Sequence, residues 1–168
     1  PDVVHYLEGR GLLVPETLLA HPKMAYYENG ELLAHYPAML GKAVTRDGKP
    51  VSFHRTYIRN GQKAPVTSPR KMMRTARKTK GYAIRLFAAD DEIVIAEGIE
   101  TAIACYMLWG VPAWSVVSAN GMQDFDVPEG VQRIIVAGDN DESYTGQAAA
   151  FEKARRLRAN GDTVDVRI

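Results

Sequence analysis

The sequence predicts an α/β protein in which a compact parallel sheet flanked by helices follows a small basic α+β subdomain of antiparallel hairpins. Two observations predict the parallel sheet. From residue 92 onward apolar runs alternate with helical segments, and the runs at 93–96 and 134–137 contain no polar residue. Strands covered by helices on both faces have this composition. A third observation predicts the hairpins, because Asn29-Gly30 and Asp47-Gly48 are pairs that favour tight turns.

The first 80 residues are expected to contain one short helix and two hairpins. The segment VVHYLEGRGL (3–12) has helical periodicity, and strand-like runs then flank the two turn pairs over residues 24–40 and 41–65. The basic segment SPRKMMRTARKTKG (68–81) follows, and YAIRLF (82–87) is expected to return the chain to the second half. We therefore expect two domains, at residues 1–80 and 81–168.

Four strands and two helices are expected in the acidic second half. EIVIAEG (92–98) predicts a strand and the next residues a helix that stops at Gly110. PAWSVVSANG (112–121) predicts a second strand that ends at Asn120 and Gly121, and QRIIVAGDND (132–141) predicts a third.

A second helix and a closing strand complete this half. GQAAAFEKARRLRANG (146–161) is strongly helical, and DTVDVRI (162–168) alternates like a strand, with Val164, Val166 and Ile168 on one face. The apolar positions predict which residues of the two helices face inward. They are Ile103, Met107 and Leu108 in the first helix, and Ala149, Phe151, Ala154 and Leu157 in the second.

The composition is that of a soluble globular protein. The 168 residues are 46% hydrophobic and 24% charged, and no apolar run approaches the roughly 20 residues that cross a bilayer. Cys105 is the only cysteine, which excludes an intrachain disulfide and a thiolate zinc cluster and favours simple core packing. A chain with one cysteine suits the reducing cytoplasm, and that is the expected location.

Charge is distributed unevenly along the chain. Residues 1–91 contain 15 Lys and Arg against 8 Asp and Glu, whereas residues 92–168 contain 6 against 12. The two parts therefore carry formal charges of +7 and −6. Two solvated surfaces that happen to differ would look the same, but the asymmetry also fits a basic segment that meets a polyanion and an acidic one that holds cations.

Three carboxylates follow the two apolar runs. Glu97 comes after the first run, and Asp139 and Asp141 come after the second. If these strands are neighbours in a parallel sheet, the three side chains converge at its carboxyl edge, where such sheets bind ligands. Residues two apart on an extended chain point the same way, so Asn140 would point elsewhere. Three hard oxygen donors suit Mg²⁺ or Mn²⁺, and phosphoryl transfer is the reaction that needs them there.

Other roles for these aspartates stay open. Asp139 and Asp141 could form only a turn and a cap for the next helix. An EF-hand loop that starts at Asp139 is excluded, because it requires Gly and Glu where Tyr144 and Ala150 stand. An aspartyl-phosphatase pair is disfavoured, since that motif opens its domain and only 27 residues follow Asp141.

Three segments together resemble the signature of a Toprim domain, the catalytic module shared by topoisomerases and primases. They are IVIAEGIETAIA (93–104), SVVSANGM (115–122) and RIIVAGDNDESYTGQAAA (133–150). The likeness covers the acidic half, and it is to the Toprim type of phage- and plasmid-borne primases and primase-helicases. It implies the Toprim fold and a metal site formed by an invariant glutamate and a D-x-D pair.

The resemblance assigns roles to individual residues. Glu97 matches the invariant glutamate, Asp139 and Asp141 match the metal-binding pair, and Gly121 matches the turn that approaches the site. One position departs from the pattern, because bacterial primases carry a further aspartate where Thr101 stands. The neighbouring Glu100 is a candidate substitute, although it could equally favour the start of its helix through the helix dipole.

The segment VSFHRTYIRNGQKAPVTSPRKMM (51–73) resembles the part that precedes the Toprim domain in mobile-element primases. That likeness offers five basic residues as ligands for template or nucleotide phosphates: Arg55, Lys63, Arg70, Lys71 and Arg74. Alternation also places aromatic rings and arginines on one face of 51–59, which suits stacking on bases. Each segment also has a purely structural alternative. Residues 51–59 could be a half-buried strand whose arginines reach solvent, and residues 70–80, six of which are basic, could be a solvated linker. The four histidines, His5, His21, His35 and His54, lack ligand spacing, and no chemistry is expected of them.

The function implied by the resemblance is that of a DNA primase catalytic core from a phage, plasmid or integrated element. Such an enzyme is a Mg²⁺- or Mn²⁺-dependent nucleotidyltransferase, and its partners would be single-stranded DNA template, nucleotide triphosphates and a replicative helicase or further primase domains. Glu97 would ligate metal or act as general acid or base. Two alternatives remain, namely DNA cleavage by a Toprim nuclease or topoisomerase, and a non-catalytic nucleic-acid-binding or regulatory module.

Overall fold

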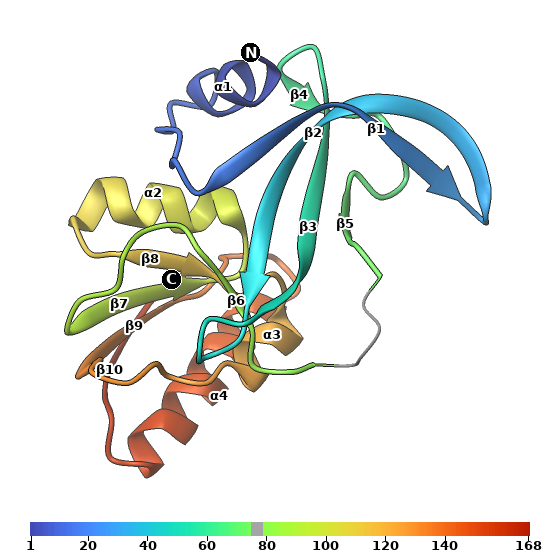
Figure 1. Ribbon diagram of the computed structural model, residues 1–168. Helices are drawn as coiled ribbons and strands as arrows, with labels where there is room; N and C mark the ends of the chain where they lie inside the picture. Colours follow the sequence, from blue (N-terminus) through green and yellow to red (C-terminus); the bar gives the residue numbers. More distant parts are fainter. Residues whose placement is uncertain (75–78) are drawn as a thin grey trace.

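The structure, a computed structural model, describes residues 1–74 and 79–168 (Figure 1). Its first part is built from one helix and five strands: α1 (Asp2–Glu8), β1 (Leu18–Glu28), β2 (Glu31–Val44), β3 (Pro50–Arg59), β4 (Gln62–Lys63) and β5 (Arg70–Met72). Both predicted hairpins are confirmed. The β1–β2 turn has positive φ at Asn29 (51°) and Gly30 (88°), the conformation that an Asn-Gly pair favours, and the β2–β3 turn contains Asp47 and Gly48.

The second part alternates strands with helices, as predicted. Its elements are β6 (Ala83–Arg85), β7 (Glu92–Ala96), α2 (Ile99–Trp109), β8 (Ala113–Ser115), α3 (Ala119–Asp124), β9 (Arg133–Ala137), α4 (Thr145–Ala159) and β10 (Thr163–Arg167). The strands β10, β9, β7 and β8 lie side by side and are parallel. The predicted fold class, a parallel sheet flanked by helices after an antiparallel subdomain, is confirmed.

One sheet runs through both parts. Its order is β10-β9-β7-β8-β6-β2-β3-β4, with β1 paired to β2 and β5 paired to β3. The short strand β6 joins the two parts because it pairs with β8 on one side and with β2 on the other, both antiparallel. The expected small antiparallel sheet of the first part therefore continues the parallel sheet of the second.

Helices cover the two faces of the parallel strands differently. Val94, Ala96 and Ile135 pack with residues of α1 and α2 in one core cluster. Their neighbours along the strands, including Ile95 and Val136, pack with α3 and α4 in a second cluster. Every residue from 93 to 96 and from 134 to 137 is buried, which explains the uninterrupted apolar runs. A third cluster, of Tyr26, Ala38, Tyr57 and Ala64, supports the β1–β2 hairpin.

The segment 112–121 is only partly a strand, so that prediction was wrong at its end. β8 stops at Ser115, and residues 119–124 form α3. The hydroxyl of Ser118 accepts a hydrogen bond from the Gly121 amide (3.0 Å), which satisfies a backbone donor at the start of the helix. Val117, with φ of 73°, turns the chain between β8 and α3. Four of the five residues at 113–117 are apolar, so the sequence there favours a continuous strand and does not predict this turn.

Three residues expected in the core are exposed. Met107, Leu108 and Phe151 have exposed fractions of 48%, 76% and 58%. In α2 the inward stripe is Ile99, Ala102, Ile103 and the half-buried Tyr106, and in α4 it is Gln147, Ala150, Ala154 and Leu157. At roughly 100° of rotation per residue, the three exposed side chains lie outside these stripes. None of the described helices is long and apolar enough to span a bilayer.

Candidate functional site

The three predicted carboxylates lie at the carboxyl edge of the parallel sheet. β7 and β9 are hydrogen-bonded neighbours in which Ala96 is paired with Ala137. Glu97 and Gly138 are therefore the next residues on strands that run ~4.8 Å apart, and Asp139 follows at once. The expected adjacency of the two strands is confirmed, and it brings Glu97 and Asp139 to the same edge.

Glu97 is half-buried, and it experiences the negative charge of both aspartates. Burial raises the pKa of its carboxyl, Asp139 raises it further and Asp141 adds a smaller effect, while the Arg70 guanidinium acts in the opposite direction. Below the carboxylate, the Ser115 hydroxyl donates to the Glu97 carbonyl oxygen (2.8 Å) and so ties the end of β8 to the end of β7. The site therefore concentrates repelling carboxylates next to one cation.

Asp139 is positioned by the start of α4 and by Thr101. A Cβ added to Gly146 would come within 2.5 Å of the Asp139 carbonyl oxygen, so only glycine lets α4 pack this closely on the strand end. The Thr101 hydroxyl lies 3.5 Å from Asp139 Oδ1. The residue that departs from the bacterial pattern thus contacts Asp139, one of the two predicted metal ligands, through a neutral hydroxyl.

Asp141 is held by the first turn of α4. Its Oδ1 accepts hydrogen bonds from the Thr145 amide (3.1 Å) and the Ser143 hydroxyl (2.7 Å), and its Oδ2 accepts one from the Gly146 amide (3.0 Å). The Ser143 hydrogen bond and these amides lower the pKa of Asp141. Asp141 therefore has the capping contacts that were one alternative for this residue. Asn140 has a different partner, because its Oδ1 accepts from Gln147 Nε2 (3.0 Å).

Two carboxylates at this edge are available as ligands for a divalent cation, and they do not form a complete coordination shell. Within residues 1–74 and 79–168, no three His, Cys, Asp or Glu side chains are grouped closely enough to hold a metal ion. Mg²⁺ needs only one or two carboxylates, because water and substrate phosphates supply its other ligands. Glu97 and Asp139 could form such a site, with Asp141 alongside at the start of α4. Their mutual repulsion is what a bound cation would relieve.

The register of β5 divides the predicted basic residues between two faces of the sheet. Arg70 is paired with Thr56, whereas Lys71 is paired with Arg55. Residues paired across strands share a face and successive residues alternate, so Arg70 and Lys71 point to opposite sides. Arg70 is on the side of the carboxylates: a Cβ on Gly98 would lie 4.0 Å from its Nη1. Arg55, Lys71 and Arg74 instead line a cavity beside the β1–β2 hairpin.

Lys63 and Glu100 contact each other, so neither has the surroundings that the sequence suggested. Lys63 Nζ lies 3.3 Å from Glu100 Oε1, and the Tyr6 hydroxyl donates to the same oxygen (2.5 Å). Burial would raise the pKa of Glu100, but Tyr6 and Lys63 outweigh it and the pKa is lowered. These three residues, the Tyr6–Lys63–Glu100 latch, connect α1 and β4 to the start of α2. Arg77 and Lys78 of the basic segment lie outside the described residues.

His54 is buried close to Glu100 and Arg70, and the prediction that the histidines carry no chemistry stays a prediction. His54 is 7% exposed, and burial lowers its pKa to about 4, with smaller effects from Glu100, Arg70, Arg55 and Lys63. The alternation in 51–59 that placed Arg55 on one face places His54 and Thr56 on the other. That second face, rather than the arginine face, is turned toward α2 and Glu100.

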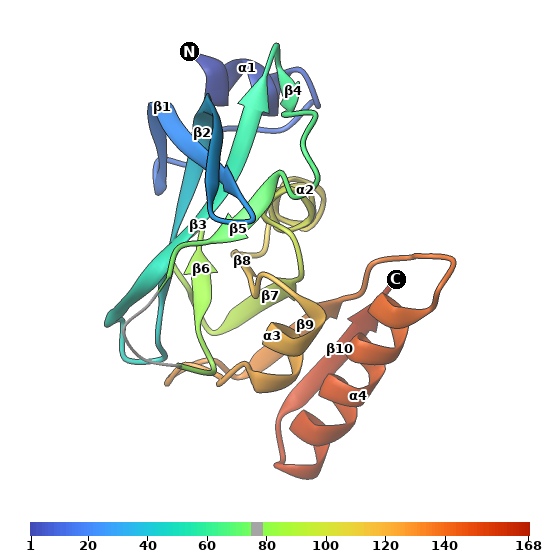
Figure 2. The same ribbon diagram turned by 90° about the vertical axis from the view of Figure 1, so that its right-hand side faces the viewer.

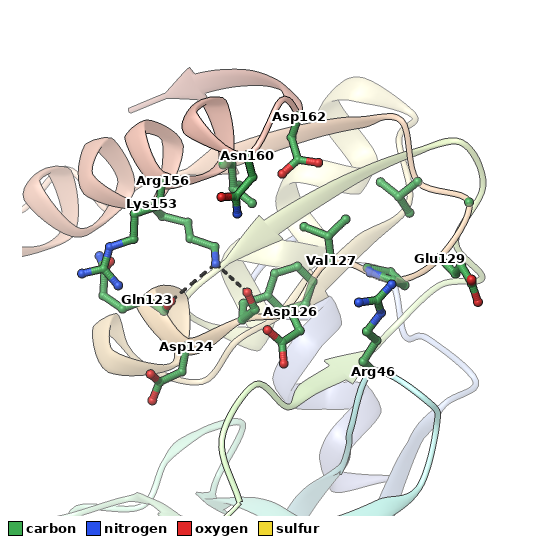
Figure 3. Close-up of a pocket in the computed structure, with 15 residues that line it drawn as sticks. Arg46, Gln123, Asp124, Asp126, Val127, Glu129, Lys153, Arg156, Asn160 and Asp162 are labelled. Atoms are coloured by element: carbon green, nitrogen blue, oxygen red, sulfur yellow. Dashed lines mark hydrogen bonds between the residues drawn. The ribbon is translucent and has the colours of Figure 1, made fainter.

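A separate cavity lies between α3, α4 and the 125–131 loop (Figure 3). Its lining includes none of the three site carboxylates and mixes both signs of charge, with Arg46, Lys153 and Arg156 beside Asp124, Asp126, Glu129 and Asp162. The buried Lys153 ammonium donates to the carbonyl oxygens of Gln123 and Phe125, as the dashed lines show. These hydrogen bonds connect the end of α3 to α4. The Lys153 amine at the wall of this cavity is therefore already engaged in contacts that hold the fold together.

Comparison with known families divides the chain near residue 90. Residues 2–86 match the Domain of unknown function (DUF7146), and residues 92–167 match the Toprim domain. No curated protein showed significant similarity.

Solved structures of primases share the fold. The primase fragment of the bacteriophage T7 primase-helicase superposes with a TM-score of 0.56 at 18% identity, covering 79% of this chain and 54% of that one. The E. coli primase catalytic core gives 0.52 at 13% identity, covering 98% and 50%. A T7 DNA polymerase structure with primase domains bound to an RNA/DNA hybrid and dTTP gives 0.51 at 18%, covering 79% and 66%. The chain thus spans about half the length of the first T7 fragment. It belongs to the DUF7146 family, and its second part matches the Toprim domain and shares the fold of these primase structures.

Proposed function

We propose that the chain is the catalytic core of a DNA primase from a phage, plasmid or integrated element. It would join nucleotides on a single-stranded DNA template by metal-dependent nucleotidyl transfer. One observation carries the proposal: Glu97 and Asp139 leave neighbouring strands at the same edge, with Arg70 from the first part of the chain beside Glu97. The Toprim match and the primase fold support it.

Each site residue has a distinct role in this proposal. Glu97 and Asp139 hold Mg²⁺ or Mn²⁺, and Asp141 adds negative charge while it fixes the start of α4. A bound divalent metal neutralises charge on the attacking and leaving oxygens of a phosphoryl transfer. Arg70 supplies a planar cation on the same side of the sheet, where a guanidinium can bind two phosphate oxygens at once.

The two parts of the chain would divide the work. Residues 81–168 form the Toprim domain that holds the metal, and residues 1–80 contact template and nucleotide triphosphates. The T7 primase domains bound to an RNA/DNA hybrid and dTTP support nucleic acid and nucleotides as ligands. A replicative helicase or further primase domains would complete the enzyme.

Metal binding and primer synthesis should be measured together. Calorimetric titration with Mg²⁺ or Mn²⁺ is done on wild type, Glu97→Gln and Asp139→Asn, with Glu129→Gln as a control that removes an exposed carboxylate elsewhere. Single-stranded DNA and nucleotide triphosphates are then added, and products are separated on gels. We expect both site variants to lose metal binding and at least about 100-fold of primer synthesis, and the control to retain both.

The same samples test the alternatives. Metal-dependent nicking of plasmid DNA without primer products would replace the proposal by a Toprim nuclease. Metal binding that is equal in all variants would contradict any catalytic function of Glu97 and Asp139.

A further inference from the structure

A cavity of about 610 Å³ lies between the β1–β2 hairpin and β5, in the size range of nucleotide-sized ligand sites. Figure 2 shows this hairpin in front of β5, and Figure 1 shows its turn extending beyond β5. The cavity is called the hairpin cavity here, and its lining is Tyr27, Gly30, Arg55, Lys71, Met72, Met73 and Arg74.

The lining combines cations with an aromatic ring. Three of its seven residues are basic and none is acidic; the turn glutamates Glu28 and Glu31 are not part of it. Tyr27 is 51% exposed, so the face of its ring is available. The Arg55 Nε is buried and has no hydrogen-bond partner within the described residues. Cations beside an open aromatic ring are the combination that binds a phosphate and its base together.

The hairpin cavity is preformed. Lys71 Nζ donates to the Tyr27 carbonyl oxygen (2.6 Å) and lies 4.0 Å from the centroid of the Tyr26 ring, which fastens the hairpin to β5. On the other side the Tyr57 hydroxyl donates to the Ala25 carbonyl oxygen (2.9 Å). Lys71 is thus engaged in holding the wall. Arg55 Nη2 donates to the Met72 carbonyl oxygen (3.5 Å), so Arg55 offers only its Nε to an anion, beside the Arg74 guanidinium. A preformed site loses less entropy when a ligand binds.

The hairpin cavity and the carboxylates lie on opposite faces of β5. Arg55 and Lys71 are paired and share the face of the hairpin cavity, whereas Thr56 and Arg70 are paired and share the face of Glu97. A nucleotide in the hairpin cavity is therefore separated by β5 from the metal ligands. It cannot be the reacting nucleotide, but a longer strand can occupy both faces by crossing the edge of β5 that pairs with no strand among the described residues.

We propose that the hairpin cavity binds one nucleotide of a single-stranded nucleic acid, with the phosphate on Arg74 and Arg55 and the base on the Tyr27 ring. The identification of that strand as template rests on the proposed function. Binding itself is not expected to require metal, since the lining formed by the described residues contains no carboxylate.

The test is the affinity of the full chain for a short fluorescein-labelled oligothymidylate, followed by fluorescence anisotropy in EDTA. Arg74→Gln is compared with Arg59→Gln, and Tyr27→Ser with Leu32→Ser. Arg59 is an exposed arginine of β3, and Leu32 is the half-exposed cross-strand partner of Tyr27; neither lines the hairpin cavity. Circular dichroism checks that each variant is folded.

We expect Arg74→Gln to weaken binding about threefold or more and to reduce the slope of log K against log salt by about 0.7, the value for one phosphate on a single strand. Tyr27→Ser should weaken binding about fivefold or more, because it removes the ring on which one base stacks. Tyr27→Trp should retain binding, because it keeps an aromatic ring at this position. The two controls should bind like wild type.

Three results would overturn the inference. They are equal losses in the cavity and control variants, unchanged binding in Arg74→Gln and Tyr27→Ser, and displacement of the oligonucleotide by a free nucleotide triphosphate at the same nucleotide concentration. The assay contains no metal, so its failure is separable from failure of the proposed function. Primer synthesis that depends on Glu97, with no role for Tyr27 and Arg74, would reject the hairpin cavity alone.

Discussion

Asp139 and Asp141 are two residues apart, yet they do different things in the structure. Asp141 accepts three hydrogen bonds from the first turn of α4 and its Ser143 neighbour, whereas Asp139 contacts Thr101 and stands next to Glu97. Capping and metal binding were alternatives in the sequence, but a carboxylate has enough lone pairs for both. Stability measurements can separate the two roles.

Asp141→Ala should lower the melting temperature by about 2–4 °C, because a helix of this domain loses its capping carboxylate. Asp141→Asn should retain part of that stability, because its amide oxygen can still accept from Thr145 whereas its Nδ2 cannot accept from the Gly146 amide, and it removes the charge. Differential scanning calorimetry of the two variants beside Asp139→Asn checks this. Equal melting temperatures for Asp141→Ala and wild type would mean that the capping hydrogen bonds do not stabilise α4.

His54 should make stability depend on pH. Burial lowers its pKa from 6.5 to about 4, so between these values the unfolded chain binds a proton that the folded chain does not. The stabilisation is complete above pH 6.5 and is lost as the pH falls toward 4, at about 1 kcal/mol per pH unit near pH 5. His54→Met, of similar size and apolar, should remove this contribution.

Urea unfolding of wild type and His54→Met at pH 7.5, 6 and 5 measures the effect. The difference in unfolding free energy between the two proteins should change in favour of His54→Met as the pH falls. A difference that stays constant with pH would show that His54 takes up its proton equally in both states.

At the scale of elements, the turn between β8 and α3 depends on Gly121. A Cβ at this position would come within 1.9 Å of the Val116 carbonyl oxygen, and real atoms do not approach so closely. The Val116 carbonyl oxygen also accepts a hydrogen bond from the Ser118 amide (2.9 Å), which closes a tight turn at Val117. The backbone there therefore has little freedom to move. Gly121→Ala must therefore displace α3 or the end of β8, next to the Ser115 bond to Glu97.

Gly121→Ala should lower the free energy of unfolding by about 1–3 kcal/mol, the usual cost of overpacking. Gly98→Ala is the matched control, because its nearest contact would be an ordinary 3.4 Å from Thr101 Oγ1. We expect the control to lose less than about 1 kcal/mol. Chemical denaturation followed by tryptophan fluorescence compares them, and equal losses would contradict the assigned close approach.

The elements that the sequence predicts well are those with local causes. The Asn29-Gly30 turn needs only two residues with positive φ, and the strand at 93–96 needs only a buried apolar run. The face of the sheet on which each β5 side chain lies could not be predicted in this way. It depends on the register of β5 with β3, whose paired residues are 14 or more positions away along the chain. That register, rather than composition, separates Arg70 from Lys71.

The candidate site shows the same division between local and distant causes. Glu97 and Asp139 could be placed at one edge as soon as two parallel strands were assumed to be neighbours. The partners of Lys63 and Glu100 could not be foreseen, because Tyr6 comes from a helix 94 residues before Glu100. The expected boundary between residues 80 and 81 stays a prediction, and β6 carries the sheet from one part to the other.

At the scale of the whole molecule, two connections join the parts that the sequence separates by charge. β6 provides backbone pairing to β8 and β2, and the Tyr6–Lys63–Glu100 latch provides a largely buried charged hydrogen bond. Arg70 can stand beside Glu97 only while these connections hold the parts together. We therefore expect the chain to unfold as one cooperative unit rather than as two domains.

Tyr6→Phe tests this coupling, because it removes one hydroxyl from a fully buried ring. Losing a hydrogen bond to a charged group costs about 1.5–3 kcal/mol, so the variant should unfold at lower urea concentration. Tyr106→Phe, whose ring stacks on Phe87, is the control and should change stability little. Both tryptophans lie in the second part, so their fluorescence reports on that part, while far-ultraviolet circular dichroism reports on the whole chain. The two signals should give the same midpoint in wild type and should shift together in Tyr6→Phe. If the midpoints separate, the two parts unfold independently, and the proposed site would depend on a contact between domains that the latch does not secure.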